Sequence, residues 1–319
     1  MDPLCHTLVG ATLGCTGLEK TTAYSRITLI VAANLPDIDV VAHFMDGTAS
    51  YAFRRGITHG VPALIILPFL LTLAVIGWHR WFGKRQQGPP LSARWLLILS
   101  FIGVWSHPTL DWMNTYGMRW LMPMVNQWYY GDTLFIIDWI VWLVLALAVV
   151  LTRFPFAKSA SWYLRPASIA LAFLVAYIGA NANITRMAES AAIAASAEPP
   201  VRLLASPVPY DFRRRELVLE YADEYLIGEY RYGTVEPFRL TGKRIPKGPE
   251  EYLEQVAATK FGGWFMHWVR FPYTLIETVD GRQYITVADA RYVPDLRYQR
   301  LDGFAVFRLP LSDDPDASD

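Results

Sequence analysis

His107 and Asp111 are the residues of this sequence whose types and spacing most directly indicate chemistry. They stand four residues apart inside an apolar stretch. Four residues is slightly more than one helical turn, so a helix places both side chains on one face. An imidazole and a carboxylate are costly to bury in a membrane helix, and holding a divalent metal ion is one reason to keep them there. A structural hydrogen bond between helices is the simpler alternative.

Further side chains of the same types precede this pair. His6 occurs near the start of the chain, Asp37 and Asp39 follow an apolar stretch, and His59 directly precedes another. The predicted metal ligands are His6, Asp37, Asp39, His59, His107 and Asp111. Imidazole nitrogens combined with carboxylate oxygens suit zinc, manganese or iron better than calcium or magnesium. We expect one or two divalent metal ions, with zinc as the first choice, although helix capping could instead explain one of the two neighbouring aspartates.

Three residues are candidates for a catalytic role, namely Asp39, Arg55 and Asn114. A carboxylate that is not fully committed to the metal would act as a general base. An arginine of the pair Arg54-Arg55 would bind a phosphate or another anion, or both would be plain anchors at a membrane interface. The expected reaction is hydrolysis by metal-activated water.

The chain that must position these residues has the composition of an integral membrane protein. Of its 319 residues, 53% are hydrophobic and only 18% are charged, against about 25% charged residues in a typical soluble domain. The net charge is zero, so no nucleic-acid partner is expected. Cys5 and Cys15 lie ten residues apart, too far along one helix for a disulfide, and are interpreted as small apolar residues.

Four segments are long and apolar enough to cross a bilayer, which takes about 20 residues. They cover residues 61–78, 95–113, 133–151 and 167–184. Two shorter apolar stretches, 4–18 and 26–42, precede them, and composition leaves open whether these also span. The predicted fold is a mainly α membrane protein: a helical bundle of four clear transmembrane helices plus two short N-terminal helices, followed by a small extracytoplasmic, mostly-β domain.

The loops between these segments predict an orientation. The loop after the first span carries four basic residues and no acid, and the loop after the third carries three and no acid. By the positive-inside rule both loops are cytoplasmic. Most of the predicted ligands then fall near the opposite, outer face, although they were not used to set the orientation. The loop charges and the positions of the ligands thus agree, which supports a single site at the outer face.

The predicted domains are a helical membrane domain over 1–185, a mostly-β domain over 201–312 and an acidic tail over 313–319. The alanine-rich segment 186–200 between the first two is predicted to be a linker or the exit of the last helix. The strands predicted in the third part are Glu216–Tyr221, Tyr225–Tyr232, Thr274–Val279, Gln283–Ala288 and Ala305–Leu309. The Asp-Gly pair at Asp280 predicts a hairpin between the third and fourth of these strands.

An ordered set of motifs in the first 185 residues resembles a known family. The motifs are His6 with Gly10, the run 36–39, the run 55–59, the run 106–111, the run 114–117 and the run 132–138. Together they resemble the YdjM-like family of bacterial membrane-bound metal-dependent hydrolases, also described as LexA-binding inner-membrane-associated hydrolases. Two positions depart from that pattern: Arg54 stands in place of a histidine, and Gly60 in place of a serine.

The resemblance implies a multi-pass protein of the bacterial inner membrane and a metal-dependent hydrolase. Combined with the predicted site, it indicates action at the outer face of that membrane on an ester or phosphoester. The expected partners are membrane lipids and a small-molecule or lipid substrate, and no oligomeric state is predicted. The alternatives are a metal or ion transporter, a scaffold whose β domain binds a partner, or an outer domain that carries the function while the membrane part anchors it.

Overall fold

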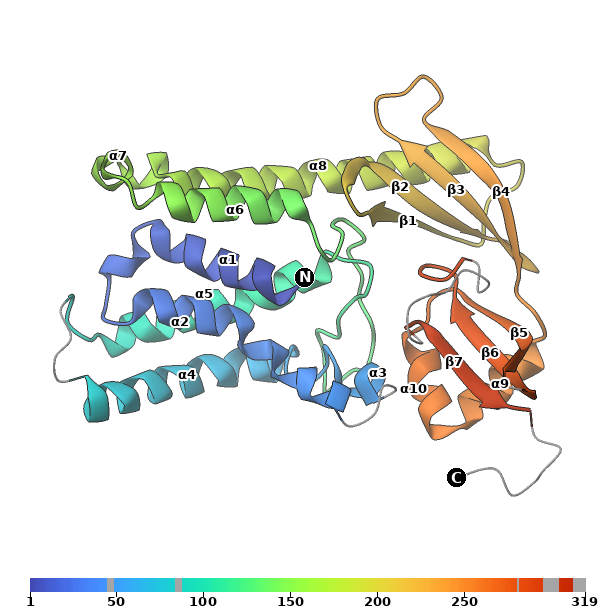
Figure 1. Ribbon diagram of the computed structural model, residues 1–319, viewed down its shortest axis with the longest axis horizontal. Helices are drawn as coiled ribbons and strands as arrows, with labels where there is room; N and C mark the ends of the chain where they lie inside the picture. The colour runs from blue at the N-terminus through green and yellow to red at the C-terminus, as the bar shows by residue number, and fades with distance from the viewer. Residues whose placement is uncertain (45–48, 84–87, 280, 295–303, 312–319) are drawn as a thin grey trace. The chain divides into compact units, whose positions relative to one another are not determined.

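The computed structural model describes residues 1–44, 49–83, 88–279, 281–294 and 304–311. Asp280 and the predicted acidic tail, residues 313–319, lie outside the described residues. The chain forms two compact units (Figure 1). The first contains residues 1–41, 53–183 and 209–212, and the second contains residues 42–52, 184–208 and 213–319.

The first unit is helical, and two short helices lie at its centre. Its elements are α1 (Pro3–Cys15), η1 (Leu18–Lys20), α2 (Ser25–Asn34), η2 (Leu35–Phe44), α4 (Val61–Phe82), α5 (Ala93–Trp112), α6 (Trp139–Leu151), α7 (Pro155–Ser159), η3 (Trp162–Leu164) and the first part of α8 (Pro166–Ala195), the η elements being 3-10 turns. Helices α1 and α2 lie side by side, α2 also packs on α5, and α1 also packs on α6. Helix α4 packs on α5.

Glycines let α1 and α5 approach the backbone of α2 closely. A Cβ atom added at Gly10 of α1 would lie 2.7 Å from the carbonyl oxygen of Leu29. A Cβ atom added at Gly103 of α5 would overlap the side chain of Ala32. Small residues at such contacts are typical of helix packing in membranes. Helix α2 is therefore held tightly between the helices that carry His6 and His107.

Among the described residues, two helices are long and apolar enough to cross a membrane, α4 and α8. The prediction of four clear transmembrane helices is not supported. Helix α5 has 20 residues, but polar side chains such as His107 and Asp111 lower its hydropathy. Helix α6 begins only after Asp138, which caps it, and its 13 residues span about 20 Å, less than the roughly 30 Å of a hydrocarbon core.

The first N-terminal apolar stretch forms α1, of 13 residues, and the second forms α2, of 10 residues, together with most of the 3-10 helix η2. At 1.5 Å per residue these helices are about 20 Å and 15 Å long, too short to span on their own. Helices α4 and α6 nevertheless leave large apolar side chains exposed, including Leu70 (54%), Leu73 (65%) and Leu143 (58%). Such a surface is typical of contact with lipid.

The second unit contains two antiparallel sheets. The first sheet contains, in spatial order, β1 (Arg202–Val208), β2 (Asp211–Glu220), β3 (Glu224–Arg231) and β4 (Phe238–Pro246). The second contains β5 (Pro272–Val279), β6 (Arg282–Asp289) and β7 (Val306–Pro310). The helices of this unit are α3 (Ala49–Phe53), α9 (Glu250–Ala258) and α10 (Lys260–Trp268). The predicted hairpin is confirmed, since Val279 pairs with Arg282 and Thr278 with Gln283. Strands β1 and β4 and the helices of this unit were not predicted.

The end of α8 packs on the first sheet. Ala188 and Ala192 are fully buried and lie in one apolar cluster with Ile184, Leu217 and Leu219. Residues 186–195 belong to α8, so for this part the second of the two predicted alternatives, the exit of the last helix, is correct. The small alanine side chains give the end of α8 a narrow face, which lets the helix lie close to the strands.

Helix α3 contributes to the core of the second unit through Tyr51. Its ring centroid lies 5.2 Å from that of Phe265 and 4.8 Å from that of Trp268. Its hydroxyl accepts a hydrogen bond from the backbone nitrogen of Ala305 at 3.1 Å. Tyr51 thus anchors α3 in the core of this unit.

Candidate metal centre

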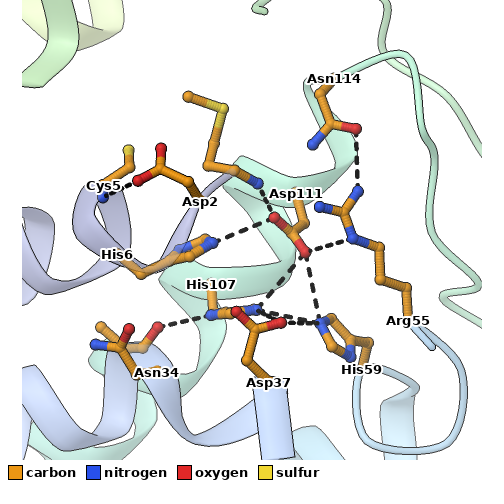
Figure 2. Close-up of polar contacts among 12 residues, drawn as sticks. Asp2, Cys5, His6, Asn34, Asp37, Arg55, His59, His107, Asp111 and Asn114 are labelled. Carbon is orange, nitrogen blue, oxygen red and sulfur yellow. Dashed lines mark hydrogen bonds and ion pairs between the residues drawn. The ribbon is translucent and has the colours of Figure 1, made fainter. Parts of the chain in front are cut away.

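Three elements of the first unit bring two histidines and two aspartates together (Figure 2). Turn η2 supplies Asp37, the loop before α4 supplies His59, and α5 supplies His107 and Asp111. Each of these residues offers one ligand atom, and the four atoms lie within 4.8 Å of one another. They are the members of the predicted ligand set that converge on one point.

The two histidines face each other through their Nε2 atoms, which are 3.1 Å apart. Oδ2 of Asp111 lies 3.5 Å from Nε2 of His59 and 3.6 Å from Nε2 of His107. Oδ1 of Asp37 lies 4.0 Å and 3.7 Å from the same two nitrogens. Two carboxylate oxygens therefore flank a pair of imidazole nitrogens.

The opposite nitrogen of each ring determines which tautomer is present. Nδ1 of His107 lies 2.6 Å from the carbonyl oxygen of Ala33, which can only accept, so this nitrogen carries the proton. Nδ1 of His59 lies 3.2 Å from Oδ2 of Asp39 and 3.0 Å from the hydroxyl of Thr58. That hydroxyl donates to Asp39, so Nδ1 of His59 must be the donor as well. Both Nε2 atoms then present bare lone pairs to each other.

This donor set fits a transition-metal cation. Two lone pairs at 3.1 Å repel each other, and the adjacent carboxylates add negative charge. Two nitrogen ligands about 2.0–2.1 Å from a tetrahedral zinc ion are about 3.3 Å apart, close to the observed separation. Two imidazoles with two carboxylates also match the ligand preference of zinc, manganese and iron.

The charge states of His59 and Asp39, which lie outside the membrane-spanning helices, agree with a metal site. Burial lowers the pKa of His59 below its ordinary value, although the hydrogen bond to Asp39 acts in the opposite direction. Burial alone would raise the pKa of Asp39, but its bonds to His59 and Thr58 outweigh that effect and lower the pKa. At neutral pH the ring is therefore neutral, as a metal ligand must be, and Asp39 is ionised.

Asp39 lies behind the centre and outside the group of four. Its Oδ2 atom accepts hydrogen bonds from the backbone nitrogen of Arg55 at 2.8 Å and from the hydroxyl of Thr58 at 2.9 Å, beside its contact with His59. A carboxylate on the far nitrogen of a ligating histidine fixes the orientation of the ring. The structure therefore places Asp39 as an orienting residue.

His6 approaches the centre from the other side of Asp111. Its Nε2 atom lies 3.2 Å from Oδ1 of Asp111, and its ring stacks on His107 with centroids 3.8 Å apart. The amino group of Met1 contacts the same carboxylate oxygen. Asp111 thus faces the histidine pair with Oδ2 and His6 with Oδ1.

Arg55 and Asn114 are buried supports of Asp111. Nε of Arg55 lies 2.9 Å from Oδ2 of Asp111, and its guanidinium donates to Oδ1 of Asn114 at 3.0 Å and to the carbonyl of Gly117 at 3.1 Å. The guanidinium also lies 4.8 Å from the ring centroid of Tyr116. Because only 2% of Arg55 is exposed, its charge is directed at Asp111 instead of at solvent.

The four residues differ in their access to solvent. The side chains of His59, His107 and Asp111 are fully buried, whereas 14% of the Asp37 side chain is exposed. Arg54 lies beside Asp37, with Nη2 3.4 Å from its Oδ1, and 22% of its side chain is exposed. Solvent therefore reaches the centre at Asp37 and Arg54.

Comparison with known proteins gives a match over the part of the chain that contains the candidate site. Residues 1–188 match the YdjM inner membrane protein family. This chain belongs to the YdjM inner membrane protein family. No curated protein and no solved structure matches it. All four residues of the candidate metal centre lie within the matched residues, and the family places the protein in the inner membrane.

The structure explains one departure from the YdjM pattern. Gly60 is the N-cap residue of α4, and a Cβ atom there would overlap the carbonyl oxygen of Met122. The next residue, Val61, donates its backbone nitrogen to Trp120 at 3.0 Å. The loop 118–125 therefore lies against the start of α4 and leaves no room for a serine side chain at this position.

Arg119 is a supporting residue that the sequence did not indicate. It is 1% exposed, donates to the carbonyl of Arg54 at 2.8 Å, and pairs its backbone nitrogen with the carbonyl of Arg55 at 3.0 Å. Arg55 has a φ of 52°, a left-handed conformation that costs a non-glycine residue about 1–2 kcal/mol. Arg119 and Asp39 together hold this strained residue in place.

Asp138, the last residue of the final YdjM-like motif, caps the N-terminus of α6. Its Oδ1 atom accepts from the backbone nitrogens of Ile140 and Val141 at 3.0 and 3.2 Å, and its Oδ2 atom accepts from Tyr177 at 3.0 Å. Asp2 similarly caps α1 and accepts a bond from Trp142 at 3.0 Å. These aspartates position α1 and α6 around the centre instead of contributing ligands.

Proposed function

We propose that this YdjM-family protein is a membrane-embedded metal-dependent hydrolase that acts on an ester or phosphoester at the outer face of the inner membrane. The observation that carries the proposal is the pair of bare Nε2 atoms of His59 and His107, 3.1 Å apart and flanked by two carboxylates. Zinc is the expected metal, with manganese or iron as alternatives.

The residues divide into holding and orienting groups. His59, His107, Asp111 and Asp37 would hold the metal, and Asp39 keeps Nδ1 of His59 protonated and its ring fixed. Arg55 holds Asp111 in position through its Nε atom. A divalent metal in such a site supplies Lewis-acid polarisation and lowers the pKa of water toward neutrality.

Asp37 and Arg54 are the residues that would meet a substrate. They are the partly exposed side chains at the centre, with Nη2 of Arg54 3.4 Å from Oδ1 of Asp37. Asp37 would hold the metal through one carboxylate oxygen, and its other oxygen would accept the proton of the attacking water. The sequence had indicated Asp39 for this role. The Arg54 guanidinium would bind an anionic oxygen of the substrate, as guanidinium groups do for phosphates.

Metal content and hydrolysis, measured on the full chain purified in detergent, test the proposal together. We expect about one or two equivalents of a transition metal in the wild type, and hydrolysis of a chromogenic ester or phosphodiester that a chelator abolishes and zinc restores. His107→Ala should lose both the metal and the activity, because it removes one of the facing nitrogens. His267→Ala, an exposed histidine of the second unit, is the matched control and should keep both.

Two results would overturn the proposal. One is a wild type that purifies without stoichiometric transition metal and does not take it up. The other is a metal-loaded protein that hydrolyses neither class of substrate but moves the metal into proteoliposomes in a His107-dependent manner, which would identify a transporter.

A further inference from the structure

A second polar site lies at the far end of α1 from the metal centre. The end of α1, the turn η1 and the start of α8 enclose a pocket of about 660 Å³. These three segments meet at one end of the first unit (Figure 1). Two cationic side chains, Lys20 and Arg165, line this pocket together with Leu13, Leu18 and Leu171, and no acidic residue is among its lining residues.

Arg165 is placed with unused hydrogen-bonding capacity. Its Nη1 atom donates to the carbonyl of Thr16 at 3.0 Å, which holds the guanidinium against the backbone of Gly17. Its Nε atom is buried and has no hydrogen-bond partner among the described residues. A guanidinium carries five N–H donors, so Arg165 still has donors to offer a ligand oxygen in the pocket that it lines.

Lys20 adds a second positive charge to the pocket. No carboxylate of the described residues pairs with it, and the neighbouring Glu19 contacts Arg26 instead. Helix α8 begins at Pro166, directly after Arg165, so its first backbone N–H groups lack partners within the helix. The positive end of the helix dipole therefore reinforces both cations and favours a phosphate.

The leucines and the position of the pocket distinguish a lipid from a free anion. Helix α8 is one of the two candidate membrane spans, so its first turn lies where lipid headgroups are expected. Basic pockets at the ends of membrane helices recognise anionic headgroups. We propose that this pocket binds the phosphate of an anionic phospholipid, with the adjoining acyl chain against Leu13, Leu18 and Leu171.

Short-chain phosphatidylglycerol, added to the full chain in detergent, tests this site. Native mass spectrometry should detect about one tightly held phosphatidylglycerol, and phosphatidylcholine should bind much more weakly because its choline ammonium would meet the two cations. The double variant K20Q/R165Q should weaken phosphatidylglycerol binding at least about tenfold, since it removes two charge-assisted contacts. The matched control R80Q/R94Q removes two exposed arginines outside the pocket and should bind as the wild type does.

Further measurements distinguish loss of lipid binding from loss of the metal site and from misfolding of the variant. The metal content of K20Q/R165Q should equal that of the wild type, so failure of the lipid site and failure of the metal site are distinguishable. If the double variant does not fold, K20Q alone changes an exposed side chain and should still weaken binding. Equal phosphatidylglycerol affinity of wild type and variant would overturn the proposal, as would a pocket that binds inorganic phosphate but no phospholipid.

Discussion

Each histidine of the candidate metal centre is fixed by an acceptor on its far nitrogen. His59 donates to Asp39, and His107 donates to the carbonyl of Ala33 at the end of α2. These contacts determine both the tautomer and the angle of each ring, so the two Nε2 atoms face each other before any metal binds. Such preorganisation lowers the cost of assembling a site.

The Asp39 contact gives a prediction at the scale of one residue. Asp39→Asn keeps the size of the side chain but removes the charge that favours the Nδ1–H tautomer of His59. Loss of such an orienting carboxylate typically lowers metal affinity about 10- to 100-fold. Competition of the purified variant against a chelator of known affinity would measure the change.

Asp223→Asn is the control for this substitution, because Asp223 is an exposed aspartate of the second unit. It should leave metal affinity unchanged. If Asp39→Asn bound metal as tightly as the wild type, Asp39 would not orient His59 in the manner described.

At the scale of elements, the short helix α2 decides where the histidines lie. It contacts both α1, which carries His6, and α5, which carries His107. Its last turn supplies the Ala33 carbonyl to His107. A shift of α2 would therefore disturb packing and the metal centre together.

The contact of Gly10 with α2 can be tested by adding one methyl group. Gly10→Ala places a Cβ 2.7 Å from the Leu29 carbonyl oxygen and 2.8 Å from Cα of Ile30, so the two helices must separate. Overpacking of this kind costs about 1–3 kcal/mol. We expect a lower Tm of the full chain in detergent, together with weaker metal binding.

Gly14→Ala provides the comparison on the same helix. Its added Cβ would lie no closer than 3.4 Å to Arg26, an ordinary contact, and alanine favours the helix. Its Tm should match or exceed that of the wild type. Equal loss of stability in both variants would show that the close approach of Gly10 to α2 is not what makes Gly10→Ala destabilising.

At the scale of the whole molecule, the chain passes more than once between its two units. Residues 42–52, which follow Asp37 and Asp39 and precede Arg54, belong to the second unit and anchor there through Tyr51. Helix α8 begins in the first unit and ends on the sheet of the second. The chain therefore enters the second unit before the first unit is complete.

The role of α8 in the second unit predicts where a fragment can begin. A C-terminal fragment that starts at Ile184 keeps Ala188 and Ala192, which cover Leu217 and Leu219. One that starts at Val201 exposes that apolar cluster to water, which costs about 25 cal/mol per Å² of apolar surface. Size-exclusion chromatography should show the longer fragment as the better-behaved species, and the reverse result would contradict the packing of α8.

Local pattern in the sequence determined the types of the ligands and much of the strand structure. The i, i+4 spacing of His107 and Asp111 requires one helix face, and alternating residues with an Asp-Gly turn produced the hairpin β5–β6. Both depend on neighbours in the chain, which is why spacing alone predicts them. Hydropathy also identified α4 and α8, because their apolar runs are uninterrupted.

Only the tertiary structure decided which of these residues share a centre and which support it. Asp37, Asp39 and His6 are of the same types as the other ligands, yet Asp37 faces the histidines, Asp39 lies behind His59, and His6 approaches Asp111 from the opposite side. Arg119 and the Ala33 carbonyl carry no local signal, because their roles depend on contacts 65 and 74 residues away in sequence. Sequence spacing determines which face of an element a side chain occupies, whereas the packing of distant elements determines what that side chain meets.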